Sequence, residues 1–241
     1  MKLSEAEMDK ISNDHFRADF MELQNSLGKF ILKQTETAKY NYEPSQEFLK
    51  HLTDDWLKED AATLVISFNY TDLFYGTHHA AELLYVHGSV KSIVLDKNSN
   101  KLEAYGETDT NNIVLGIDGK MKVESGHAFL YKSYRNQTNI RNIPSILNNA
   151  QRFILFGCSL GPSDRWYFER VFNGTQHDKT YEIYHFGAGN QYSINSRIED
   201  ILDSDFATFR SQNDFLYFDS SNLETAIENR NRYYANNSFN P

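Results

Sequence analysis

The stretches Ser67-Phe68-Asn69-Tyr70-Thr71-Asp72 and Tyr85-Val86-His87-Gly88-Ser89 decide how this chain is interpreted. The first follows the short apolar run Leu64–Ile66 and the second begins within the run Leu83–Val86, and such runs are typical of strands. Each also places a polar side chain, Asn69 or His87, where its strand would end. Because ligands bind at the carboxyl ends of strands in open parallel sheets, the two stretches predict a ligand site.

Runs of the same type recur along the chain and alternate with helix-length segments. They are Leu64–Phe68, Leu83–His87, Ile113–Ile117, Phe153–Gly157, Tyr181–Phe186 and Phe215–Phe218. Segments with apolar residues at helical spacing lie between several of them, around Ile140–Leu147 and Ile194–Leu202. Strands that alternate with helices predict crossover connections, and therefore a three-layer, Rossmann-like α/β fold with a mostly parallel sheet. The polar stretch Asp96–Asn100 interrupts the alternation and predicts a hairpin or surface loop.

The first sixty residues predict a helical layer that covers this sheet. Apolar residues spaced by three or four form one stripe: Phe16, Phe20, Leu23, Leu27, Phe30 and Ile31. Pro44 opens a second helical segment, whose inner face carries Phe48, Leu49, Leu52 and Trp56. No repeat and no linker rich in Pro or Gly divides the chain, so we expect a single domain over residues 1–241. Its parts are a helical layer at 1–60, an α/β core at 61–220, and a C-terminal helix to about Arg232 with a frayed tail at 221–241.

The composition limits the class of function. The chain has 241 residues, of which 40% are hydrophobic and 14% aromatic, and this suffices for a packed core. A net charge of −9 argues against broad binding to nucleic acid, which needs dense Lys and Arg. The single cysteine, Cys158, excludes an internal disulfide or a multi-cysteine zinc site and fits a reducing cytoplasm. No apolar run approaches the ~18 residues of a membrane span. The polar N-terminus argues against a signal peptide, so we expect a cytoplasmic protein with no membrane contact.

Asn69 and His87 are the candidate catalytic residues. An Asn side chain accepts and donates hydrogen bonds, so it can orient a water or a ribose hydroxyl. Imidazole titrates near neutral pH and is the usual general base, and Gly88 beside it allows a ligand to approach closely. The structural alternatives are that Asn69, Thr71 and Asp72 cap a following helix, and that His87 is hydrogen-bonded at a sheet edge.

A strand, a glycine turn and a helix start follow one another at Phe153–Asp164. Gly157 permits the tight turn, Ser159 offers a hydroxyl beside a backbone amide, and Asp164 or Ser163 caps the helix. Such an arrangement can hold a ribose or a phosphate at a helix N-terminus, although it is not a full Gly-x-Gly-x-x-Gly fingerprint. Gly187-Ala188-Gly189-Asn190 offers the same backbone freedom after the next strand, but alone it is typical of an ordinary turn.

Two other groups of residues invite a chemical interpretation and do not support one. Cys158 follows a core strand, which predicts a buried thiol rather than a nucleophile. The pair His78-His79 with His87 lacks an acid or a cysteine at a recognisable ligand spacing, so we expect no metal.

Four short motifs in fixed order carry a resemblance to a known family: Phe68–Asp72, Val86–Ser89, Ile113–Asp118 and Gly157–Asp164. Together they resemble the AbiH family of bacterial abortive-infection proteins and, more distantly, the sirtuin-like NAD-binding domains. The resemblance covers about residues 60–190. Members of the AbiH family usually begin with a strand and a Gly-Asn-Gly-Phe-Asp loop under the nucleotide phosphates, and residues 1–60 contain no such loop. The resemblance therefore implies a form of the family without it.

The resemblance also implies a role for each matched residue. Asn69 stands where sirtuin-like domains have the Asn that positions water or ribose, and His87 stands at their histidine base. Gly157, Cys158 and Ser159 match the turn that holds the ribose and phosphates, so we expect this turn on the rim of a cleft that Asn69 and His87 share. The complete nucleotide-binding set is Asp72, Gly88, Gly157, Cys158, Ser159, Asp164, Gly187, Gly189 and Asn190. A single cysteine cannot supply the zinc module of sirtuin deacetylases, which argues against protein deacetylation.

Two functions stay open at this point. The first is hydrolysis of the nicotinamide–ribose bond of NAD through an oxocarbenium-like transition state, which would stop phage growth by depleting NAD. The second is a module that senses a nucleotide or pairs with another protein without turnover, which the absent loop and the acidic charge favour. In both cases the expected ligand is NAD or a related nucleotide. A sheet without its first strand leaves an edge or an apolar face uncovered, so we also expect a homo-oligomer or a partner protein.

Overall fold

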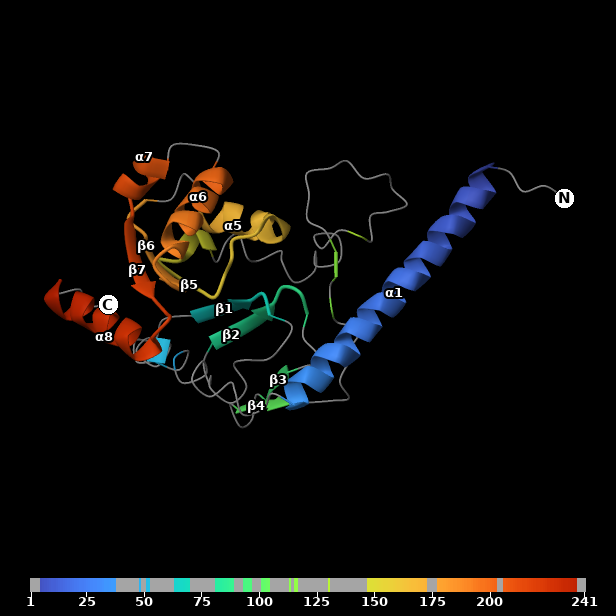
Figure 1. The fold of residues 1–241 in the computed structure, drawn as a ribbon, viewed down its shortest axis with the longest axis horizontal. Coiled ribbons are helices and arrows are strands. Elements are labelled where there is room, and N and C mark those ends of the chain that lie inside the picture. The colour runs from blue at the N-terminus through green and yellow to red at the C-terminus, as the bar shows by residue number, and fades with distance from the viewer. Residues whose placement is uncertain are drawn as a thin grey trace. The chain divides into compact units, whose positions relative to one another are not determined.

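The computed structural model describes residues 5–37, 48, 51–52, 63–69, 81–88, 93–96, 101–104, 113, 115–116, 130, 147–172, 177–202 and 206–237. Within these ranges helices and strands are mixed, and the strands form small sheets (Figure 1). Contacts along the chain divide it into two compact units, residues 1–138 and 139–241. The expected single domain stays a prediction.

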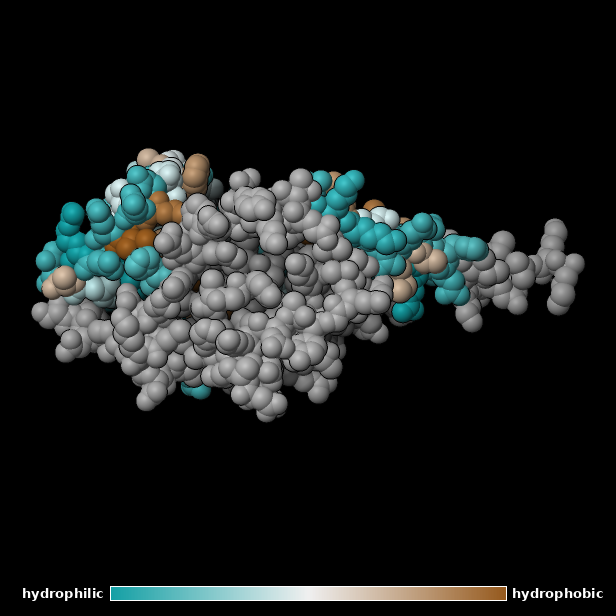
Figure 2. Space-filling model, turned by 90° about the horizontal axis from the view of Figure 1, so that it is seen from below, coloured by the Kyte–Doolittle hydropathy of each residue, from teal (hydrophilic) through white to brown (hydrophobic). Residues whose placement is uncertain are grey.

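The first unit opens with a long helix, α1 (Glu5–Thr37). Its 33 residues span about 50 Å at the usual rise of an α-helix. The predicted apolar stripe is only partly covered. Gln24, beside it, is buried and donates from Nε2 to the carbonyl of Ile113 at 2.8 Å, whereas Phe16, Leu23 and Phe30 are 46%, 58% and 59% exposed. The view in Figure 2 shows a few hydrophobic side chains among the hydrophilic ones on the described part of this helix.

The second predicted helical segment is described at three positions. Phe48, His51 and Leu52 are helical, and the side chains of Phe48 and Leu52 are buried, as an inner face requires. Leu49 and Trp56 lie outside the described residues.

Two pairs of strands follow in the first unit. β1 (Thr63–Ser67) and β2 (Ala81–Tyr85) are parallel, with Thr63 opposite Ala81 and Ser67 opposite Tyr85. β3 (Ile93–Asp96) and β4 (Lys101–Ala104) are antiparallel, which confirms the hairpin predicted from the polar stretch between them.

The strand predicted at 113–117 is wrong at the positions that the structure describes. Ile113, Leu115 and Gly116 lie outside any strand, although Ile113 is fully buried. Its carbonyl accepts a hydrogen bond from the side chain of Gln24 instead of from a neighbouring strand. An apolar run predicts burial, and here burial came without strand pairing.

The second unit is built on a parallel sheet in the order β5-β6-β7 (Figure 1). The strands are β5 (Arg152–Phe156), β6 (Thr180–His185) and β7 (Asp214–Asp219), and they confirm the runs predicted there. A short 3₁₀ turn, η3 (Pro162–Asp164), and α5 (Arg165–Val171) join the first two strands. α6 (Asn190–Leu202) and α7 (Phe206–Ser211) join the last two, and α8 (Leu223–Asn236) follows. α8 thus ends beyond the predicted Arg232, while residues 238–241 of the predicted frayed tail lie outside the described residues.

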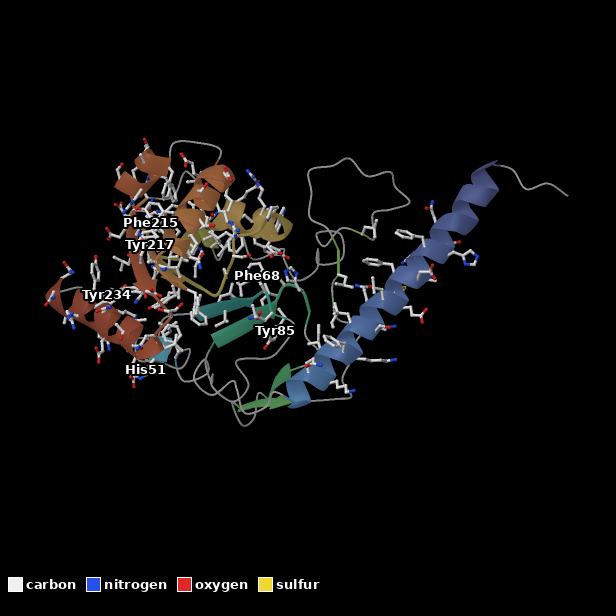
Figure 3. All side chains as sticks on the ribbon, in the orientation of Figure 1. His51, Phe68, Tyr85, Phe215, Tyr217 and Tyr234 are labelled. Carbon is white, nitrogen blue, oxygen red and sulfur yellow. The ribbon has the colours of Figure 1, made fainter. Side chains whose placement is uncertain are left out.

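One face of this sheet packs through aromatic rings. Tyr181, in the central strand, is fully buried between Phe153 and Phe215, with ring centroids at 5.0 and 4.8 Å. Phe172 at the end of α5 and Phe209 of α7 contact the same ring, and Figure 3 shows Phe215 and Tyr217 on the strand beside it. Offset aromatic contacts of this kind add to the stabilisation that burial provides. Aromatic residues therefore form the core on this side of the sheet.

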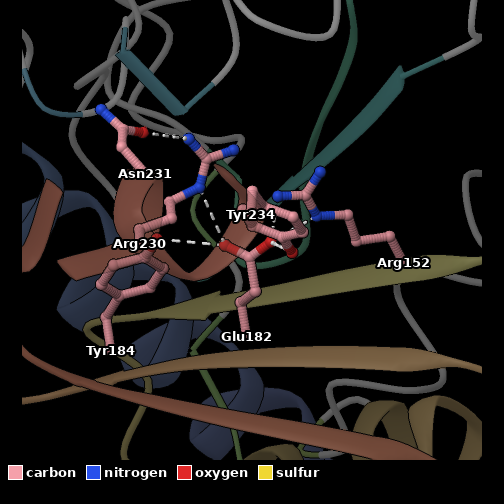
Figure 4. Close-up of polar contacts among 6 residues, drawn as sticks. All are labelled: Arg152, Glu182, Tyr184, Arg230, Asn231 and Tyr234. Carbon is pink, nitrogen blue, oxygen red and sulfur yellow. Dashed lines mark hydrogen bonds and ion pairs between the residues drawn. The ribbon is translucent and has the colours of Figure 1, made fainter. Parts of the chain in front are cut away.

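The opposite face is closed by α8 through a polar cluster (Figure 4). Glu182 points from β6 to this side, is fully buried, and binds Arg152 of β5 together with Arg230 and Tyr234 of α8. Helices therefore cover both faces of this sheet. The described strands form three separate sheets, so one large Rossmann-like sheet stays a prediction. Among the described helices, none combines the length and apolar character needed to span a membrane.

Candidate functional site

Asn69 and His87 occupy equivalent positions on two neighbouring strands. β1 and β2 pair in parallel with Ser67 opposite Tyr85, and each candidate follows two residues later. The N–H of Val86 donates to the carbonyl of Ser67 at 3.0 Å, which extends the ladder past the strand end. Because adjacent strands lie about 4.8 Å apart, both residues leave the same edge of the sheet side by side. Figure 3 labels Phe68 and Tyr85 at these strand ends.

The two candidates differ in environment. Asn69 is exposed, and its backbone N–H donates to Oγ of Ser67 at 3.3 Å. His87 is only 4% exposed, and its ring meets the ring of Phe68 edge-on at 5.7 Å between centroids. The two candidates therefore follow the same end of the strand pair, one exposed and one buried. Their roles in catalysis stay predictions.

The turn after β5 contains two residues in the left-handed region. Gly157 has φ of 63°, and a Cβ placed there would meet no atom of the described residues within 4 Å. Leu160 has φ of 51° while its side chain is buried, and a non-glycine residue held there stores conformational energy. Arg197 of α6 donates to the carbonyl of Ser159 and fixes the turn from the other side. This hydrogen bond links the turn to α6, and the described residues leave open space at Gly157.

Cys158 in this turn carries a protonated thiol. Burial, followed by the nearby carboxylate of Asp164, raises its pKa to about 11, and Sγ donates to the carbonyl of Phe156 at 3.4 Å. A thiol that remains protonated at neutral pH is not an activated nucleophile. Asp164 occupies the N-cap position of α5, but its side chain makes none of the capping hydrogen bonds that the sequence predicted.

The loop after β6 is held by residues that the sequence analysis did not single out. His185 ends the strand, and its Nδ1 lies 3.0 Å from the carbonyl of Gly187. Asp219 ends β7, and its Oδ1 accepts from the backbone N–H groups of Ser221 and Gly187, each at 2.9 Å. These hydrogen bonds, that from Ser221 first, lower the pKa of Asp219 to about 2. No motif marks either residue, because both bind backbone atoms: His185 binds the loop after its own strand, and Asp219 binds that loop and the one after β7.

Gly189 and Asn190 complete the predicted loop. Gly189 has open space at its Cβ position, and Asn190 begins α6 while its side-chain amide donates to the carbonyl of Phe186. Gly88 has φ of 74° directly after His87. Asp72 lies outside the described residues. The shared cleft of Asn69, His87 and the Gly157 turn stays a prediction. Within the described ranges, no group of three or more His, Cys, Asp or Glu side chains could hold a metal.

Three comparisons with known proteins complete these observations. A family model described as Bacteriophage abortive infection AbiH matches residues 3–186, which include α1, β1, β2, β5 and β6. The comparisons with curated proteins and with solved structures gave no match.

Proposed function

Because the chain belongs to the bacteriophage abortive-infection AbiH family, we propose that it serves phage defence by binding NAD or a related nucleotide and hydrolysing the nicotinamide–ribose bond. The residues proposed for the chemistry are Asn69 and His87. The residues proposed for nucleotide binding are those of the turn at Gly157–Ser159 and of the loop at Gly187–Asn190. The sirtuin-like resemblance of the motifs supports this assignment.

In the proposed reaction the bond between ribose C1′ and the nicotinamide nitrogen breaks, and its electron pair leaves with nicotinamide. The Asn69 amide orients a water toward C1′, because it can accept one hydrogen bond and donate another. His87 takes the proton of that water as the new C–O bond forms. The products are nicotinamide and ADP-ribose. Binding energy from the remote part of the nucleotide would position the reacting bond.

The observation that carries the proposal is the matched position of Asn69 and His87 on adjacent parallel strands. Carboxyl ends of parallel strands are where open α/β sheets bind ligands, and Asn69 and His87 both follow those ends at equivalent positions. The left-handed turn at Gly157 supports nucleotide binding at the corresponding edge of the second unit's sheet.

The direct test is release of nicotinamide from NAD by the purified protein. We expect Asn69→Ala to abolish release and to change stability by no more than about 0.5 kcal/mol, since its side chain is exposed. His87 is buried, so His87→Gln is preferred to alanine because it retains most of the side-chain volume. We expect this variant also to lose release while its thermal unfolding remains close to that of the wild type.

Matched controls are available for both variants. Asn149→Ala and His51→Gln change the same residue types at exposed positions that do not follow the carboxyl end of a strand, and both should retain full activity. A wild-type protein that releases no nicotinamide would exclude the hydrolase. Active Asn69→Ala and His87→Gln proteins would exclude the assignment of these two residues.

A second candidate function, a protein-interaction module, is favoured by the surface of α1. Phe16, Leu23 and Phe30 are exposed at intervals of seven residues, so they form one row along the helix. A seven-residue apolar repeat is the pattern with which one helix packs along another. A protein that recognises a partner through this row need not turn over a nucleotide.

A further inference from the structure

A histidine between a glycine and an aspartate lies at the carboxyl edge of the second unit's sheet. His185 is opposite Asp219 of β7 in the strand register. On its other side, Phe156 is opposite Tyr184, so Gly157 follows beside His185. Gly157 has no side chain, and the position of its missing Cβ is open. His185 therefore has an ionised carboxylate on one side and open space on the other.

The hydrogen bond at Nδ1 fixes the tautomer of this histidine. The partner of Nδ1 is the carbonyl oxygen of Gly187, which can only accept. Nδ1 must therefore carry the proton, and in the neutral ring Nε2 bears the lone pair. No hydrogen bond from the described part of the chain reaches Nε2, although the residue is only 7% exposed. This nearly buried side chain thus keeps an acceptor for a group that the described part of the chain does not supply.

The surroundings hold this acceptor in place. Gly187 is bound from two strands. Its carbonyl is bound by His185 of β6, and its N–H donates to Asp219 of β7 at 2.9 Å. The carbonyl of His185 accepts from the N–H of Ser220 at 2.7 Å and from its hydroxyl at 3.0 Å. Groups held before a ligand arrives lose little freedom on binding, which favours a recognition role.

The chemistry of the site selects the class of ligand group. A lone pair requires a hydrogen-bond donor, and the carboxylate of Asp219 nearby disfavours an anion at Nε2. A sugar hydroxyl is a neutral donor. The 70% exposed ring of Phe186, in the same loop, provides a flat apolar surface of the kind on which bases stack.

We propose that His185 recognises a ribose hydroxyl of the bound nucleotide through Nε2. This inference rests on the proposed nucleotide binding, and it assigns the ribose to a residue outside the predicted site. His185 is a binding residue here and takes no part in breaking the glycosidic bond.

The test compares AMP with its dideoxyribose analogue, which lacks both ribose hydroxyls, by calorimetric titration of the full chain. We expect the wild type to bind AMP about five- to tenfold more tightly, as loss of one hydrogen bond predicts. His185→Asn should lose this preference and bind both compounds like the dideoxy analogue. The Asn amide can still donate to the carbonyl of Gly187, so the loop should remain in place. His177→Asn, a change at an exposed histidine of the same unit, should retain the preference.

Nitrogen NMR of the wild-type imidazoles provides a second measurement if His185→Asn does not fold. We expect Nε2 of His185 to be unprotonated in the free protein, and to shift when AMP is added but not when the dideoxy analogue is added. A protonated Nε2 in the neutral ring, an equal affinity for both compounds, or a retained preference in His185→Asn would overturn the role of His185 alone. Failure of the wild type to bind either compound would overturn the proposed nucleotide binding as well.

Discussion

Replacement of Glu182 by glutamine should destabilise the second unit strongly. The carboxylate accepts from the hydroxyl of Tyr234 at 2.6 Å and of Tyr184 at 3.1 Å, and it pairs with the guanidinium groups of Arg152 and Arg230. Glutamine keeps the shape but removes the charge, and it leaves both guanidinium groups without this counterion. Loss of one partner from a buried ion pair costs about 3–5 kcal/mol.

The lower end of that range applies here, because the side chain of Arg152 is 20% exposed and water partly screens its charge. We therefore expect a loss of about 3 kcal/mol. With a denaturant slope of about 2 kcal/mol per molar urea, the unfolding midpoint should fall by about 1.5 M. Fluorescence and circular dichroism, followed in parallel, would show whether the two compact units unfold separately.

Neighbouring tyrosines on α8 provide the matched pair of variants. Tyr234→Phe removes a hydrogen bond to the carboxylate and should cost about 1.5–3 kcal/mol. Tyr233→Phe removes a hydroxyl with no bond to Glu182 and should change stability by less than about 0.5 kcal/mol. If Glu182→Gln shifts the midpoint no more than Tyr233→Phe does, the cluster does not hold α8 to the sheet and the reasoning is refuted.

Three further outcomes follow from the described residues. The pKa of Cys158 is about 11, against 9.0 for an ordinary thiol, so little thiolate is present at pH 8. Iodoacetamide should therefore modify Cys158 roughly a hundredfold more slowly in the folded protein than in urea. Equal rates would contradict this. The lowered pKa of Asp219 contributes stability that is present above its unfolded pKa of about 3.9 and is lost as the pH falls toward about 2, so Asp219→Asn should flatten the acid limb of the stability curve measured by urea unfolding. Serine in place of the exposed row on α1 (Phe16, Leu23 and Phe30) should weaken the predicted self-association and leave stability unchanged. An unchanged mass by light scattering would exclude that row as the interface.

The strands of the second unit could be predicted because their sequences are short apolar runs, which are typical of buried strands. β6, Thr180–His185, is buried along nearly its whole length, as expected for the central strand of a parallel sheet. The same pattern misled at Ile113, which is buried but whose carbonyl accepts from the side chain of Gln24 and not from a strand. Periodicity records which residues avoid water and says nothing about which backbone groups pair.

The register in which two strands pair is the second feature that could not be predicted from the sequence. The apolar runs begin at Leu64 and Leu83, yet the structure places Leu64 opposite Glu82. This single-residue shift is what brings Asn69 and His87 to equivalent positions, and no local pattern specifies it. His185 was beyond prediction for a related reason, because its tautomer depends on a carbonyl contributed by a loop that the sequence describes only as a turn.

The order of synthesis determines when the Glu182 cluster can form in the nascent chain. Arg152 precedes Glu182, but Arg230 and Tyr234 are encoded 48 and 52 residues after it. At translation rates of about 5–20 residues per second, several seconds pass between the synthesis of Glu182 and that of its partners on α8. During that interval the carboxylate must stay hydrated, so that face of the sheet cannot close while the strands are being made. We expect a nascent chain halted before Leu223 to resist protease less well than one that includes Asn236, even though both contain every strand of the sheet.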